Sequence, residues 1–138
     1  MDATGRRAWV QAVVLVGVLY TVIGAISAAL AGRAESHQMV VAWRLAAWMA
    51  SAIAFATHIG YEHFRLRATP RTAAWHVAAA VALGGLGLAI AANIHAVTAN
   101  TQRLLIPALV IWPVLTGLLA FVVALVAAAL LARMRPHE

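Results

Sequence analysis

The sequence predicts an all-α integral membrane protein, a single up-down-up-down four-helix bundle formed by residues 1–138. Three observations support this fold class. Hydrophobic residues make up 64% of the chain and charged residues 10%, whereas soluble domains average about 45–50% and about 25%. Four apolar stretches each reach the roughly 20 residues that a membrane-spanning helix needs. The linkers between them are short, which favours antiparallel neighbours.

The four apolar stretches are continuous and rich in alanine and leucine, which is typical of helices rather than alternating barrel strands. They are Trp9–Ala31, Met39–Tyr61, Ala73–Val97 and Leu104–Ala132. The first is longer than the roughly 7–15 residues of a signal-peptide hydrophobic region, so we expect it to be retained as a span. Pro107 fits the first turn of the fourth helix, and Pro113 is expected to kink it.

Arginine placement predicts the orientation of the chain. All ten basic residues are arginines, and there is no lysine. With the N-terminus inside, the inner arginines are Arg6, Arg7, Arg65, Arg67, Arg71, Arg133 and Arg135. Arg33 and Arg103 are then the outer ones, and Arg44 falls within the second span. Because basic residues concentrate on the cytoplasmic side, we expect a multi-pass protein of the bacterial inner membrane with both termini cytoplasmic.

Several kinds of chemistry are excluded or unsupported by the residues present. The chain has no cysteine, which excludes thiol catalysis, iron–sulfur clusters and cysteine-ligated zinc. No carboxylate pair, Ser/His/Asp arrangement or phosphate-binding loop is evident, so we expect no enzymatic activity. The formal net charge of +6 is explained by membrane orientation, and no nucleic-acid partner is expected.

The second span carries the most informative pattern. Its residues Arg44, Trp48, Ser51, Phe55, His58 and Glu62 are separated by steps of four, three, four, three and four. This spacing places them on one face of a helix. Since polar groups facing lipid are costly, the stripe is expected to face the bundle interior. The other spans offer stripes of small residues, such as Gly17 and Gly24, that favour close helix packing.

His58 and His76 are expected at equal depth, because a hairpin centred near Arg67 places both about one turn inside the cytoplasmic interface. Glu62 lies one turn from His58 on the same stripe. The bland interpretation is an interhelical hydrogen bond, with the carboxylate extending towards nearby arginines. Those arginines are Arg65, Arg67 and Arg71. His63 is expected to point elsewhere, at the interface.

Two functional interpretations of the same residues stay open. His58 and His76 could supply axial imidazoles to a b-type haem, or bind a divalent metal together with Glu62. Alternatively, the three side chains could form a proton relay. The sequence itself favours no cofactor.

A second polar group is expected in the outer half of the bundle. Arg44, Asn93 and His95 could form a buried anion or headgroup site, with Ser27 level with Arg44. The bland alternative is that the Arg44 side chain extends to the interface. Asn93 and His95 are two residues apart, so they face different directions on a helix.

The leading functional hypothesis is a non-catalytic accessory or packing subunit that meets the lipid bilayer and forms a homo-oligomer or part of a larger membrane complex. The first alternative is a small proton-linked carrier or channel that uses Arg44, His58 and Glu62. The second is a haem-binding redox subunit that uses His58 and His76.

Overall fold

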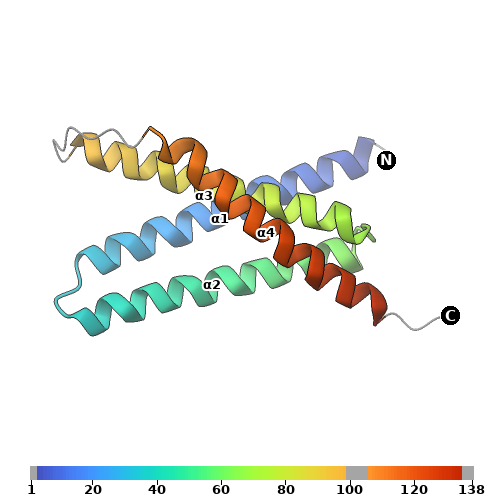
Figure 1. The fold of residues 1–138 in the computed structure, drawn as a ribbon, viewed down its shortest axis with the longest axis horizontal. Coiled ribbons are helices and arrows are strands. Elements are labelled where there is room, and N and C mark those ends of the chain that lie inside the picture. Colours follow the sequence, from blue (N-terminus) through green and yellow to red (C-terminus); the bar gives the residue numbers. More distant parts are fainter. Residues whose placement is uncertain (1–2, 99–105, 135–138) are drawn as a thin grey trace.

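A computed structural model of the chain describes residues 3–98 and 106–134 (Figure 1). These residues form helices α1 (Ala3–Gly32), α2 (His37–Phe64), α3 (Pro70–Thr98) and α4 (Ala108–Arg133). Each is long and apolar enough to cross a membrane. The all-helical prediction is therefore confirmed, and the chain is consistent with a multi-pass membrane protein. The first residues of the predicted fourth stretch, 104–105, lie outside the described residues.

Polar residues at the turns explain where two of the helices begin. The Ser36 side chain accepts a hydrogen bond from the backbone N–H of Met39 at 3.3 Å, which caps α2. Thr69 accepts one from the N–H of Thr72 at 3.3 Å, and Pro70 occupies the first position of α3, where its missing N–H costs nothing. These caps start α2 and α3 two to three residues before the apolar stretches.

Successive helices run in alternating directions (Figure 1). The start of α1, the α2–α3 turn and the end of α4 lie at one end of the molecule, on the right of the view, which we call the terminal end. The α1–α2 turn lies at the opposite end, which we call the far end. The α2–α3 turn reverses the chain at Arg67, whose φ of 48° is the one positive non-glycine value among the described residues.

The four helices do not form a closed bundle of equal neighbours. α3 is central and packs between α1 and α4, whereas the described parts of α1 and α4 do not contact each other. α2 lies along α1 and reaches α3 and α4 mainly at the terminal end. There Ile59 joins a small core with Ala74, Val77 and Ala124. The open arrangement leaves the far half of α2 covered only on its α1 side.

Close packing of α3 on its two neighbours depends on glycine. A Cβ built on Gly84 would lie 2.5 Å from Tyr20 Cβ, and one built on Gly17 would lie 2.8 Å from Leu83 Cβ. On the other side of α3, a Cβ on Gly117 of α4 would lie 3.1 Å from Ala82 Cβ. Only glycine allows the backbones to approach this closely. The small-residue stripes are thus used within the chain.

Candidate functional site

Three ionisable side chains meet at the terminal end, close to the α2–α3 turn. His58 and Glu62 lie one turn apart on α2, and His76 lies on α3. Glu62 Oε2 lies 2.9 Å from His76 Nδ1, which is a hydrogen bond between the two helices. Glu62 Oε1 lies 3.7 Å from His58 Nε2, which is too long for a hydrogen bond. We call these residues the His58–Glu62–His76 triad.

The triad is removed from solvent. The Glu62 side chain is 0% exposed, that of His58 is 1% and that of His76 is 13%. The buried residues of α2 are His58, Ile59, Glu62 and His63, all in its last two turns. Their spacing of one, three and one residues places them on a single face of α2. At this end of the helix, that face packs against α3. The fold therefore buries a carboxylate where it would otherwise meet lipid or water.

Trp9 adds α1 to the site, which the sequence did not indicate. Its indole stacks on the His76 imidazole with ring centroids 4.6 Å apart and an interplanar angle of 3°. In the sequence, Trp9 marks only the start of the first apolar stretch. Its position near the start of α1, at the same end as the start of α3, was the available signal. The stacking covers one face of the His76 ring and fixes the plane in which its nitrogens lie.

Several polar atoms around the triad have no hydrogen-bond partner among the described residues. They are both ring nitrogens of His58, Oε1 of Glu62 and Nε1 of Trp9. Buried polar atoms without a partner are costly, so such groups call for a functional explanation or an unseen water or ion. Here His58 Nε2 and Glu62 Oε1 face each other across 3.7 Å. A proton on the imidazole would turn this contact into a charge-assisted hydrogen bond after a small movement.

The interpretation that gave Glu62 a purely structural role was wrong about the direction of its side chain. Its carboxylate was expected to extend towards the arginines of the turn, yet it is fully buried against His76. The reason is that Glu62 lies on the same face of α2 as His58, and at the terminal end this face packs against α3. The turn is instead fixed by backbone hydrogen bonds, including Ala68 N–H to Glu62 O at 3.1 Å. The turn arginines Arg65, Arg67 and Arg71 are exposed.

His63 was also expected elsewhere. It was placed at the membrane interface, but it is 4% exposed and its ring meets Phe64 edge-on at 4.9 Å between centroids. The reason is that the buried face of α2 at this end is two residues wide at each turn. His63 follows Glu62 directly and shares the burial of its neighbour.

The geometry of the triad bears on the haem and metal alternatives. The Glu62 carboxylate contacts both imidazoles, so Nδ1 of His76 and Nε2 of His58 each face a carboxylate oxygen. Within the described ranges, no group of three His, Cys, Asp or Glu residues is placed to hold a metal ion. This arrangement does not favour an axial imidazole pair, and the cofactor alternatives stay predictions.

The second predicted polar group is not brought together. Asn93 donates from Nδ2 to the backbone carbonyl of Ala89 in its own helix, at 2.9 Å, and His95 is exposed. Arg44 is also exposed, and the cavity beside it is lined by α1 and α2 without any α3 residue. Ser27 does line that cavity with Arg44. Ser51 is half-buried between these two regions of α2.

Comparison with protein-family models, curated proteins and solved structures found no match for this chain. A function must therefore be inferred from the arrangement of the residues of this chain. Of these, the triad is the most unusual feature, because it holds a fully buried carboxylate between two imidazoles.

Proposed function

We propose that this chain is a small proton-linked carrier or channel that takes up and releases a proton at the His58–Glu62–His76 triad. The observation that carries the proposal is the Glu62 carboxylate, which is fully buried within a helix apolar enough to span a membrane and contacts an imidazole on either side. Ionisable groups inside membrane spans commonly mark proton or ion pathways. Histidine changes charge near neutral pH, which suits reversible transfer.

The two contacts of Glu62 give the triad two different places for a proton. The 2.9 Å contact with His76 Nδ1 already holds one proton between nitrogen and oxygen. The contact with His58 Nε2, at 3.7 Å, is too long for a hydrogen bond. A proton arriving at His58 would complete a second hydrogen bond to Glu62, and its departure would restore the open contact. The low dielectric around the triad strengthens the attraction between imidazolium and carboxylate.

The proposed orientation places the terminal end in the cytoplasm, with the chain in a bacterial inner membrane. The exposed arginines at the terminal end are Arg7, Arg65, Arg67, Arg71 and Arg133. Arg33 lies at the far end, while Arg103 and Arg135 lie outside the described residues, as does the side chain of Arg6. The bias towards the terminal end supports cytoplasmic termini. The triad would then exchange protons with the cytoplasmic side.

The accessory-subunit hypothesis stays a prediction with less support. It is based on small-residue stripes, little mass outside the membrane and missing catalytic motifs. The glycines of those stripes, such as Gly17, Gly84 and Gly117, pack α1 and α4 against α3. They therefore point to no outside partner. The proton proposal needs no covalent chemistry, in keeping with the expectation that the chain is not an enzyme.

Proton movement into liposomes tests the proposal. The purified protein is reconstituted with a pH-sensitive dye inside, and a potassium diffusion potential of negative interior is set with valinomycin. We expect acidification several-fold faster than in protein-free liposomes. Glu62→Gln keeps the size of the side chain but removes its charge, and should return the rate to that of empty liposomes.

Glu35→Gln is the matched control, because Glu35 is an exposed carboxylate in the α1–α2 turn. It should leave the rate unchanged. Circular dichroism and size-exclusion chromatography of each variant confirm that the fold is kept. A wild-type rate equal to that of empty liposomes, or an unchanged rate in Glu62→Gln, contradicts the proposal.

A further inference from the structure

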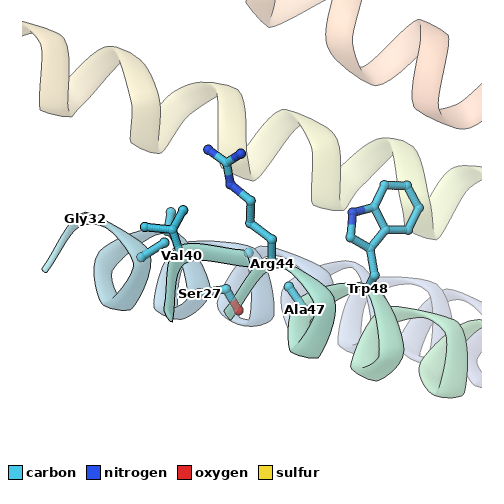
Figure 2. Close-up of a pocket in the computed structure, with 9 residues that line it drawn as sticks. Ser27, Gly32, Val40, Arg44, Ala47 and Trp48 are labelled. Carbon is cyan, nitrogen blue, oxygen red and sulfur yellow. The ribbon is translucent and has the colours of Figure 1, made fainter. Parts of the chain in front are cut away.

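A cavity of about 460 Å³ lies between α1 and α2 in the far half of the molecule. Small residues of α1 form one wall, and larger residues of α2 form the other (Figure 2). The residues that matter here are Gly24, Ser27 and Ala28 of α1 and Val40, Arg44 and Trp48 of α2. The Arg44 and Trp48 side chains project from the same side of α2, one turn apart. A cation and a large aromatic ring thus flank one opening.

Arg44 carries a charge that nothing else in the described residues compensates. No described carboxylate lies within ion-pairing distance of its guanidinium, and the nearest turn carboxylate, Glu35, makes no such contact. A charged group inside a membrane span is costly unless it meets a counter-charge or water.

The depth of Arg44 identifies which anion is within reach. The 28 residues of α2 give a helix of about 42 Å at roughly 1.5 Å per residue. A hydrocarbon core of about 30 Å then leaves about 6 Å of helix beyond each boundary. Arg44 is seven residues from His37, about 10 Å along the helix, so its Cα lies roughly 4 Å inside the boundary. A long arginine side chain extends from there to the level of lipid headgroups.

The cavity continues about one turn deeper than Arg44, to Gly24, Ala47 and Trp48, while Ala31, Gly32 and Val40 line it towards the α1–α2 turn. Trp48 is one turn nearer the centre than Arg44, and its side chain is 76% exposed, so no other helix covers it. Ala28 leaves room on the α1 side because its side chain is small, whereas Gly24 accommodates the Leu88 side chain of α3. The cavity thus has a cationic group at headgroup level and apolar residues beneath it. This arrangement is complementary to an anionic headgroup joined to an acyl chain.

We propose that this cavity binds one anionic membrane lipid, with its acidic headgroup on Arg44 and an acyl chain between Trp48 and the small residues of α1. The charge of Arg44 selects the headgroup, and the apolar lining between Arg44 and Trp48 accepts the start of the chain. A free anion would use only the first of these features. This inference does not rest on the proton proposal, because Arg44 lies fourteen residues from His58, about 21 Å along α2.

Native mass spectrometry of the detergent-purified protein tests the inference. The protein is titrated with phosphatidylglycerol or with phosphatidylcholine of the same acyl chains. A charge-assisted contact gives an expected preference of about tenfold for phosphatidylglycerol. Arg44→Gln should abolish the preference and Arg44→Lys should keep part of it. Arg33→Gln, which removes an exposed arginine beside the α1–α2 turn, should leave it intact.

Three outcomes would overturn the inference. Equal retention of the two lipids, or a preference unchanged in Arg44→Gln, shows that Arg44 does not select an anionic headgroup. Displacement of phosphatidylglycerol by millimolar inorganic phosphate shows a site for a free anion. A dimer that excludes lipid and is lost in Arg44→Gln shows that a second copy of the chain covers this face. In support, phosphatidylglycerol with brominated chains should quench the wild-type tryptophan fluorescence more strongly than that of Trp48→Phe.

Discussion

The Nδ1 atom of His76 lies 2.9 Å from Oε2 of Glu62, so a hydrogen bond inside the fold joins the carboxylate of α2 to the imidazole of α3. The partner on the other side, His58, stops 3.7 Å short of the second carboxylate oxygen. The closed contact joins the two helices. Under the proposed proton-linked function, the open contact is the place where a proton would bind.

Leucine substitution of the two histidines should therefore have unequal effects on stability. His76→Leu leaves Glu62 buried without its hydrogen bond and should lower the free energy of unfolding by about 3 kcal/mol. His58→Leu removes ring nitrogens that have no hydrogen-bond partner among the described residues. It should change that free energy by less than about 1 kcal/mol, or raise it. Thermal or SDS-induced unfolding in the same detergent measures both.

The comparison has an internal control in the double variant His76→Leu with Glu62→Leu. Removing both partners of the hydrogen bond leaves no unpaired buried charge, so it should recover much of the stability lost in His76→Leu. Equal losses in His58→Leu and His76→Leu would mean that the His58 contact is a closed hydrogen bond as well. The proton place proposed between His58 and Glu62 would then not exist.

The sequence brought Glu62 close to both His58 and His76, as the structure does, because their levels along the helices follow from local geometry. The helix rise and the short α2–α3 turn fix the levels of His58 and His76, and the four-residue step fixes Glu62 beside His58. These quantities do not depend on how the helices are arranged around one another. They were therefore accessible without any knowledge of the tertiary structure.

The arrangement of the helices around one another could not be predicted from the sequence. The wrong predictions about individual side chains follow from this. Every span offers small residues, so the sequence does not say that α3 packs between α1 and α4 and leaves α2 aside. Without this order, the sequence did not predict the contact between Trp9 and His76, and Arg44 was expected to face the interior. The predicted direction of the Glu62 side chain was wrong for the same reason. Its attraction to the nearby arginines was considered without the competing hydrogen bond to His76 of α3.

Alanine at Gly84 should destabilise the fold more than alanine at glycines that face open space. A Cβ at Gly84 would lie 2.5 Å from Tyr20 Cβ, an atom held close to its own backbone. Overpacking of this kind costs about 1–3 kcal/mol. Gly60→Ala is the control, since nothing lies within 4 Å of its Cβ, and alanine there should be neutral or stabilising by up to about 1 kcal/mol.

Gly24→Ala should cause an intermediate loss of stability. The atoms nearest its Cβ belong to the flexible end of the Leu88 side chain, at 2.6 Å. That side chain can change rotamer, so the loss of stability should fall between those of Gly84→Ala and Gly60→Ala. Unfolding of all three variants in one detergent orders them. A larger loss at Gly60 than at Gly84 would contradict the packing of α1 on α3.

Addition of haemin to the purified protein should give no bis-imidazole absorption spectrum. Glu62 lies between the two rings, and one nitrogen of His76 is already engaged by that carboxylate. The Soret region of a haemin titration, read against His58→Ala, provides the measurement, and the two proteins should behave alike. A sharp Soret band that is lost in both His58→Ala and His76→Ala would instead support the haem-binding alternative.

Removal of the Trp9 indole should change the magnetic environment of His76 without disturbing the rest of α3. The two rings are parallel within 3° and their centroids are 4.6 Å apart, so the indole ring current shields the carbon-bound protons of the imidazole. In Trp9→Leu these proton signals should move downfield in NMR spectra of the histidine-labelled protein. Trp75→Leu is the matched control, because Trp75 packs against Phe121 of α4 instead, and it should leave the His76 signals in place. Unchanged His76 signals in Trp9→Leu would show that α1 does not reach the triad in the membrane protein, and that His76 is oriented by Glu62 alone.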